Sequence, residues 1–383
     1  MSERSLAAVV ATPAGRKWLA DHGVHTDVEQ FAAALRPAAD GGAATLAGLP
    51  PDSPLVYVGQ QIAADFGHAT AAKFGAVHDL RTADVASVVA WHDMDRAGSD
   101  RYGLRVVIAM GGRPTGVWLA HRKLGDREPR FIPADYARLE ELLRKARSAT
   151  SGMPRATRAQ VLARLDGFAE DLARQPPETV AQAGRTLATR LLREHLDVEV
   201  PGVYVSQLAT AGLLRELLLQ VLDALDDVAR VYNEAVADLT REGLDPQVHA
   251  LDERWLPLWY SCPDSGRRLR LVRERAGADL FGTADCPCGA EHRYHLGNGS
   301  PCLDELETAG RWSPDVLLPV LCDHLFSGYV AGRSSAIYGI VMRRVLRSAL
   351  ERTPTPAFLP AALAAPPTAP PEPDSLLHSY LTA

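Results

Sequence analysis

The chain has 383 residues, of which 46% are hydrophobic and 23% charged, and 41 Lys and Arg against 47 Asp and Glu give a net charge of −6. This composition excludes a wholly disordered chain, and the lack of a basic excess argues against duplex nucleic acid or an anionic membrane surface as a partner. No apolar run approaches the roughly 20 residues that cross a bilayer, and no signal peptide is recognisable, so we expect a cytoplasmic protein.

The first part of the chain predicts an N-terminal helical region at 1–50 followed by the first part of an α/β core at 51–132. Two apolar strand patterns, at 55–59 and 85–91, enclose a helical pattern, as in a βαβ unit of a parallel sheet. The residues at 104–119 indicate a hairpin that leaves the main sheet. We therefore predict the α/β class, with a Rossmann-like parallel sheet as its core.

The rest of the chain predicts helical insertions, a second small element and the end of the core. Residues 133–250 are helical, with a core strand near 197–207 and one long amphipathic helix at 213–239. The remaining segments are a basic hairpin with a zinc-knuckle-like Cys/His insert at 251–310, the last part of the core at 311–352, and a Pro-rich tail at 353–383. The tail is expected to fold poorly, although 376–381 has the pattern of a short docking helix.

Two candidate turns follow the two strands of the expected βαβ unit. The first is the Gly-Gln-Gln sequence at 59–61, which leads through Gly67 and His68 to Lys73. A turn of this kind opens a helix and presents backbone N–H groups to a phosphate or carboxylate. Because neither a Walker pattern nor a complete GxGxxG motif is present, a structural turn with an ordinary buried histidine is the alternative.

The second turn is Trp-His-Asp-Met-Asp at 91–95. His92 is a candidate acid, base or hydrogen-bond donor, and Asp93 or Asp95 is a candidate ligand for an amine or a magnesium ion. The carboxyl ends of parallel strands meet at one sheet edge, so this turn and the first should face one cleft. A strand-to-loop cap with solvated aspartates is the alternative interpretation.

All five cysteines lie in the last third of the chain, an odd number that suits a metal or free thiols better than disulfides. Two loops that begin with Cys-Pro resemble the knuckles of a zinc ribbon and predict a structural zinc site. Free thiols are the alternative, and His295 or Cys302 could replace the histidine among the four ligands. These four ligands are Cys262, Cys286, Cys288 and His292.

The last candidate is the Gly-Arg-Ser-Ser turn at 332–335, which joins an apolar strand pattern to a helix. It offers a second anion cradle in which Arg333 is a charged clamp. A simple strand–turn–helix connection is the alternative interpretation.

Taken together, these segments resemble the bacillithiol synthase family, the cysteine-adding enzymes that join cysteine to a glucosaminyl-malate amine. That family is similar in fold to class I aminoacyl-tRNA synthetases, which implies a Rossmann-like core with inserted elements. Besides the helix that carries Lys73, the segments are LVYVGQQ at 55–61, WHDMD at 91–95, GLDPQVH at 243–249, WLPLWYSCPDSGRRLRL at 255–271 and RWSPDVLLPVLCDHLFSGYVAGRSSAIYG at 311–339.

The resemblance implies an amide-forming ligase that joins cysteine or another amino acid to a small-molecule amine through a carboxylate activated by ATP with magnesium. A donor carried on tRNA or a carrier is an alternative to ATP, a homodimer is compatible with the sequence, and a non-catalytic, zinc-stabilised scaffold is the alternative function. The predicted catalytic residues are His92, Asp93 and His68. The predicted nucleotide-binding residues are Gly59, Gln60, Gln61, Gly67, Lys73, Gly332, Arg333, Ser334 and Ser335.

Overall fold

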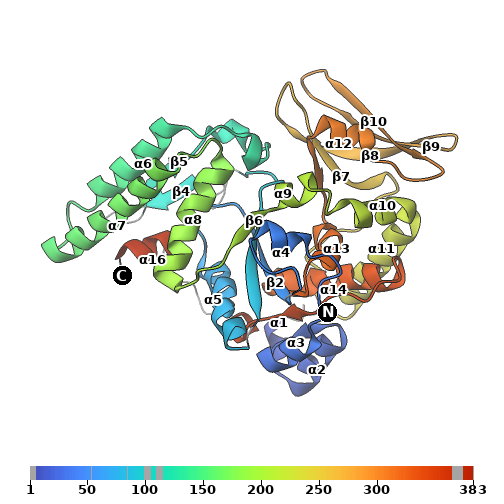
Figure 1. The fold of residues 1–383 in the computed structure, drawn as a ribbon, viewed down its shortest axis with the longest axis horizontal. Coiled ribbons are helices and arrows are strands. Elements are labelled where there is room, and N and C mark those ends of the chain that lie inside the picture. The colour runs from blue at the N-terminus through green and yellow to red at the C-terminus, as the bar shows by residue number, and fades with distance from the viewer. Residues whose placement is uncertain are drawn as a thin grey trace.

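The computed structural model describes residues 6–52, 54–83, 85–98, 105–108, 115–364 and 374–382. Its centre is a six-stranded parallel sheet with helices around it, which confirms the predicted α/β class (Figure 1). In spatial order the strands are β1 (Val24–His25), β13 (Ala357–Phe358), β12 (Gly328–Val330), β2 (Leu55–Gln61), β3 (Ala86–His92) and β6 (Gly202–Tyr204).

The strand order reverses its direction between β2 and β12. From β2 the chain adds β3 and then β6 on one side, whereas β12 and β13, which come later in the sequence, lie on the other side. Ligands of open parallel sheets bind outside the carboxyl ends of the strands at such a switch point. The topology therefore predicts a ligand site at the carboxyl ends of β2, β3 and β12.

Both faces of the sheet are buried. Successive residues of β2, Leu55 and Val56, belong to two different hydrophobic clusters, and so do Val88 and Val89 of β3. This alternation follows from the two-residue period of a strand, and a parallel sheet covered on both faces has apolar residues at consecutive positions. The apolar runs that predicted these strands reflect that double burial.

Two helices flank the switch point. Helix α5 (His68–Thr82) follows β2, and helix α14 (Arg333–Ser348) follows β12. Remaining helices of at least four residues are α1 (Leu6–Val10), α2 (Pro13–Asp21), α3 (Val28–Ala34), α4 (Gly42–Leu46), α6 (Tyr136–Ala149), α7 (Arg155–Arg174), α8 (Val180–Leu196), α9 (Val205–Thr210), α10 (Arg215–Asp223), α11 (Leu225–Arg241), α12 (Asp304–Ala309), α13 (Leu318–Leu321), α15 (Ala361–Ala364) and α16 (Leu376–Thr382).

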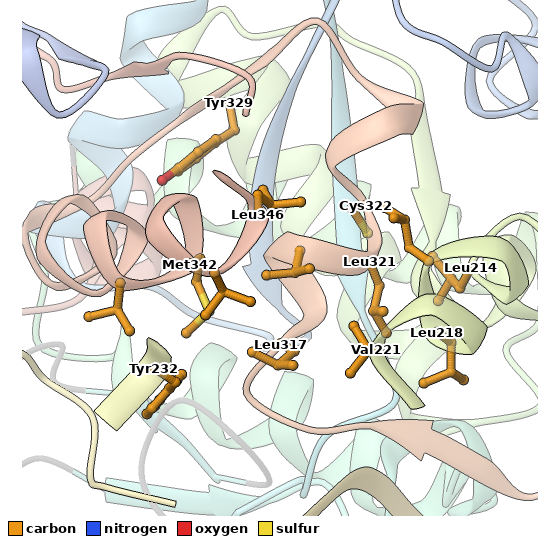
Figure 2. Packing of buried hydrophobic residues seen from close by; sticks show 14 of the residues in the cluster. Leu214, Leu218, Val221, Tyr232, Leu317, Leu321, Cys322, Tyr329, Met342 and Leu346 are labelled. Atoms are coloured by element: carbon orange, nitrogen blue, oxygen red, sulfur yellow. The ribbon is translucent and has the colours of Figure 1, made fainter. Parts of the chain in front are cut away.

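Helix α14 is held by a densely packed core. Met342 and Leu346 lie in one buried group with Leu317 and Leu321, and Leu218 of α10 belongs to the same group (Figure 2). All five side chains are at most 2% exposed. Removing a buried leucine from such a core costs about 2–5 kcal/mol. This packing fixes the helix whose first turn reaches the switch point.

A second, antiparallel sheet of five strands projects beside the core (orange, upper right of Figure 1). The predicted hairpin also forms, as a separate two-stranded sheet whose intervening turn at 109–114 lies outside the described residues. The strands of the five-stranded sheet, in spatial order, are β10 (Glu291–Asn298), β9 (Asp279–Asp285), β8 (Arg268–Ala276), β7 (Trp255–Ser261) and β11 (Trp312–Pro314), and those of the hairpin are β4 (Arg105–Ile108) and β5 (Thr115–Trp118).

Two predictions about elements are wrong. The single helix expected at 213–239 is divided into α10 and α11 at Ala224, a position that no glycine or proline marks. The Pro-rich tail contributes β13 to the sheet, between β1 and β12, and α16 docks on α7 and α8 as its pattern suggested. Among the described residues, no helix has the length and apolar character that crossing a membrane requires.

Candidate functional site

A cleft with two lobes opens at the carboxyl ends of β2, β3 and β12. The inner lobe has a volume of about 870 Å³ and includes Lys73, Arg268 and Ser334 in its lining. The outer lobe has a volume of about 890 Å³ and includes Arg122 and Lys123. Both volumes are within the range of small-molecule sites. The residues that line both lobes, here called the junction, are Gln60, Gln61, Thr70, His92 and Asp95.

The three turns that the sequence singled out in the core meet in this cleft. Gln61 at the end of β2 pairs in register with His92 at the end of β3, and the Gly-Arg-Ser-Ser turn at 332–335 lines the inner lobe. Parallel pairing brings the strand ends to one edge, so segments 30 to 270 positions apart become neighbours, as the sequence analysis expected for the first two turns.

Lys73 is a partly buried cation in the inner lobe. Its Nζ donates hydrogen bonds to the carbonyl of Gly59 and to Oε1 of Gln60, the latter at 2.9 Å. Burial lowers the pKa of Lys73 to about 8, because the charged form loses solvation. Near neutral pH the lysine therefore carries a charge that a bound anion would stabilise.

The first turn of α14 forms another part of the inner-lobe wall, beside Lys73. The N–H of Gly332 donates to Oγ of Ser335 at 2.6 Å, and Oγ of Ser334 donates to Oε1 of Gln247 at 3.1 Å. Arg333 also lines the lobe, and its Nε donates to the carbonyl of Leu363 at 2.9 Å. A helix N-terminus attracts negative charge, so this wall and Lys73 together suit an anionic group.

His92 lies at the junction with an unused hydrogen-bonding atom. Its Nδ1 is buried and has no partner among the described residues. Burial lowers the pKa of His92, and the nearby Arg268 charge also lowers it, whereas Asp95 and Asp93 raise it. The ring is therefore neutral near pH 7, the state in which one ring nitrogen can accept a proton.

Asp93, predicted to be catalytic, has a structural position instead. Its side chain is only 2% exposed and is absent from the lining of both lobes. It accepts hydrogen bonds from the backbone N–H and the hydroxyl of Ser206 in the first turn of α9. Burial raises its pKa, although the two bonds from Ser206 oppose that shift. Asp93 thus links β3 to α9.

Of the two aspartates in this turn, Asp95 is the one that lines the cleft. It accepts hydrogen bonds from Nε2 of Gln61 at 2.5 Å and from Nη1 of Arg268 at 2.8 Å. Burial would raise the pKa of Asp95, but the positive charge of Arg268, helped by hydrogen bonds from the Arg96 N–H and Gln61, contributes to a pKa that is lowered overall. The carboxylate is therefore held in its charged form at the junction.

Arg268 connects the antiparallel sheet to the cleft, and the sequence analysis did not single it out. Besides Asp95, it bonds Oγ of Ser313 and the carbonyl of Pro314, both at 3.0 Å. The fully buried Glu128 lies 3.8 Å from its Nε, and its guanidinium stacks 4.5 Å from the ring of Trp259. The sequence feature that could have identified Arg268 is its position directly after the first cysteine loop.

His68, also predicted to be catalytic, does not line either lobe. Its Nδ1 lies 2.9 Å from a carboxylate oxygen of Asp374, and its Nε2 lies 3.0 Å from the hydroxyl of Ser379. Asp374 also accepts the backbone N–H of His68, the first residue of α5. The C-terminal segment thus supplies a carboxylate to this helix N-terminus, where the sequence suggested a phosphate. Gly67, the residue before it, does line the outer lobe.

Asp315 is a further cleft residue that the sequence analysis left without a role. Its two oxygens accept the indole N–H groups of Trp255, at 3.0 Å, and Trp259, at 2.8 Å. Two donors four positions apart on strand β7 fix the carboxylate at the wall of the inner lobe. The Ser-Pro-Asp-Val-Leu-Leu segment, quoted for the family resemblance, contained this signal.

The cleft is positively charged although the whole chain is acidic. Three aspartates, Asp95, Asp126 and Asp315, line the two lobes. More than twice as many basic side chains line them, and a cleft of one sign concentrates ligands of the other. The basic residues are Lys73, Arg96, Arg122, Lys123, Arg267, Arg268 and Arg333.

The cysteine loops form a separate cluster beside the antiparallel sheet. The sulfur atoms of Cys262, Cys286 and Cys288 lie within 4.8 Å of one another, so these residues could hold a metal ion. Burial is the largest single effect on the Cys286 thiol and would raise its pKa, but hydrogen bonds from Ser265, Cys288 and Cys262 together outweigh burial and lower the pKa to about 7. Easily ionised thiols favour metal binding.

The structure separates the three candidates for a fourth ligand. Nε2 of His292 is buried without a hydrogen-bond partner among the described residues, and His292 lies close enough to Cys262 to lower the pKa of that thiol. His295 instead lies 3.0 Å from Asp279, and Cys302 interacts with Asp304. His292 is thus the candidate that adjoins the cluster.

A scan of the chain against protein-family models finds no match, and a search of curated proteins also finds none.

Proposed function

We propose that the protein is a carbon–nitrogen ligase that joins an amino acid, cysteine or another, to an amine acceptor in a small-molecule pathway. The observation that carries the proposal is the two-lobed cleft, whose lobes meet at the junction. Amide formation needs two substrates held separately but with their reacting atoms in contact, which such a cleft would provide. The strand order around β2 supports a Rossmann-like core, and the resemblance to bacillithiol synthases supports the same reaction.

The inner lobe is the proposed site of the donor and of ATP with magnesium. Its residues fit a nucleotide phosphate: Lys73 and Arg333 are cationic, and Ser334 presents a hydroxyl at a helix N-terminus. ATP would supply the activation that turns a carboxylate into an acyl donor. Lys73 would bind the negative charge of the phosphates, and Asp315 would bind the amino group of the donor.

The outer lobe is the proposed site of the amine acceptor. His92, which lines both lobes, would accept a proton from the attacking amine at a ring nitrogen, because the lowered pKa keeps the ring neutral near pH 7. Asp95, fixed by Gln61 and Arg268, would orient the ammonium form before that proton leaves. The amine would then attack the acyl carbon at the junction, and the bond between that carbon and the activating phosphate oxygen would break as AMP or phosphate leaves.

The cysteine cluster is proposed to hold a structural zinc ion through Cys262, Cys286, Cys288 and His292. Zn–S bonds of about 2.3 Å in a tetrahedral site place neighbouring sulfurs about 3.8 Å apart. The Cys262 and Cys288 sulfurs lie 3.8 Å apart, and the unpartnered His292 Nε2 is a suitable fourth donor. Four protein ligands leave no open position, so the zinc would stabilise the fold rather than catalyse.

Calorimetric titration with magnesium-ATP tests the assignment of the inner lobe. The expected result is saturable binding that weakens at least about tenfold in Lys73→Met, because a charge-assisted hydrogen bond of the phosphate is lost. Lys17→Met is the matched control, since Lys17 is an exposed lysine on α2 that pairs only with Asp21 among the described residues. Absence of ATP binding, or equal weakening in both variants, would contradict the proposal.

A further inference from the structure

A second cationic pocket lies at the opposite edge of the sheet from the cleft. It is bounded by the residues directly before β1, β12 and β13, namely Gly23, Ser327 and Pro356, and therefore lies at the amino ends of these strands. Its volume is about 400 Å³. We call it the amino-edge pocket. None of the residues assigned to the ligase reaction lines it.

Two buried side chains of the amino-edge pocket have polar atoms without partners. Arg343 of α14 is 4% exposed, and its Nε and Nη1 donate to the carbonyl of His22 and the hydroxyl of Tyr329, both at 2.7 Å. Its Nη2 has no partner among the described residues, and neither does Nδ1 of His324, a side chain that is 6% exposed. Buried polar groups are nearly always hydrogen-bonded, so these atoms indicate a missing partner.

The charges that line the pocket indicate that the missing partner is an anion. Arg36 and Arg347 also line it, and neither forms an ion pair within the part of the chain that the structure describes. Arg352, a fourth arginine, is paired with Glu216. The one carboxylate in the lining, Asp323, already accepts two hydrogen bonds from Thr355. Three arginines thus exceed a single aspartate.

His25 contributes a further unpartnered nitrogen. Its Nδ1 is buried without a hydrogen bond among the described residues, and its side chain lines the same pocket. Burial lowers the pKa of His25 and of His324, with nearby arginines adding to the effect. A bound anion would raise both pKa values again, because its negative charge favours the protonated rings, whose N–H groups can donate hydrogen bonds to it.

We propose that the amino-edge pocket binds a small anion that carries a phosphate group. Arginine guanidinium groups match the geometry of phosphate oxygens through paired N–H donors, and three of them converge here without a full set of acceptors. A volume of about 400 Å³ admits inorganic phosphate or a small phosphate ester. The inference is independent of the ligase activity, although α14 carries residues of both sites, Ser334 at the cleft and Arg343 here.

Calorimetric titration with inorganic phosphate tests the proposal in the full-length protein. In the double variant Arg36→Gln/Arg347→Gln we expect phosphate binding at the amino-edge pocket to weaken at least about tenfold, because two charge-assisted contacts are lost. These two side chains are exposed, so the fold should survive. The control is Arg155→Gln/Arg158→Gln, an equal change of charge at exposed positions of α7. Ribose 5-phosphate in place of phosphate distinguishes the two sources, because tighter binding of the ester identifies an ester as the natural ligand.

Crystals grown with tungstate, a phosphate analogue with strong anomalous scattering, locate the bound anion directly. The expected result is an anomalous peak within hydrogen-bonding distance of Arg343 and Arg347. Equal phosphate affinity in all three proteins would overturn the proposal, and so would tungstate peaks confined to the cleft. Absence of magnesium-ATP binding in the wild-type protein would contradict the ligase proposal alone and would leave the amino-edge pocket untouched.

Discussion

Replacing Arg268 by methionine should destabilise the fold more than any comparable change at the surface. The side chain is 5% exposed and joins β8 to the cleft through hydrogen bonds to Asp95, Ser313 and the carbonyl of Pro314. Methionine keeps much of the apolar contact with Trp259 but none of the five donors. The substitution therefore tests the charge network rather than the packing.

The expected loss follows from the carboxylates that remain. Glu128 is fully buried, and Asp95 is about one third exposed, so both lose a nearby positive charge in a poorly solvated environment. Breaking a buried ion pair by removing one partner costs about 3–5 kcal/mol. Glu128 keeps its contact with Arg130, which places the expected decrease in the free energy of unfolding near the lower end, about 3 kcal/mol.

Urea denaturation followed by tryptophan fluorescence measures this loss, since Trp259 lies against the guanidinium. Arg230→Met is the control, because Arg230 pairs with Asp227 and Glu234 on an exposed face of α11 and should tolerate the change. The double variant with Asp95→Asn should recover part of the stability, because it also removes one of the unpaired charges. A decrease below about 1 kcal/mol in Arg268→Met would refute the buried network as described.

Three further predictions concern the other parts of the site. Because burial lowers the pKa of Lys73 to about 8, whereas an unfolded lysine titrates near about 10.4, the folded state binds fewer protons between these values. The free energy of unfolding should then rise from about pH 8 to about pH 10, and urea titrations should show a smaller rise in Lys73→Met. An equal rise with pH in the wild-type protein and the variant would contradict the burial of the lysine charge. Elemental analysis should find one zinc per wild-type chain and less in Cys286→Ser, and substoichiometric zinc in carefully purified wild-type protein would exclude the metal centre. Kinetics of His92→Ala should show turnover reduced by roughly 10²–10⁴-fold with little change in Tm, and normal turnover in this variant would contradict the role of His92 as the base. Asp93→Ala should instead lower the free energy of unfolding by about 1–3 kcal/mol, because Ser206 loses its acceptor.

The strongly patterned parts of the fold could be predicted from the sequence. The apolar runs of β2 and β3 identified a parallel sheet, and the position of the turns after them identified the cleft. Strands β1 and β13 could not be found in this way, because two residues are too few to show a period. Their pairing depends on neighbours that are distant in the sequence.

The roles of individual site residues were harder to predict than the place of the site. Asp93 and Asp95 have the same residue type two positions apart on one turn, but Ser206 binds the first and Arg268 the second. His68 is the first residue of α5, and its ring is bound by Asp374, more than 300 positions later. Such assignments depend on tertiary contacts that no local motif encodes.

The most direct test of the ligase proposal is exchange of labelled pyrophosphate into ATP, measured with each common amino acid in turn and accompanied by assays for released ADP and AMP. The proposal predicts that one amino acid, or a small group, supports nucleotide turnover, and that Lys73→Met loses it while Lys17→Met does not. If none of the amino acids supports nucleotide turnover by folded protein in the presence of magnesium, that result would contradict an ATP-dependent ligase.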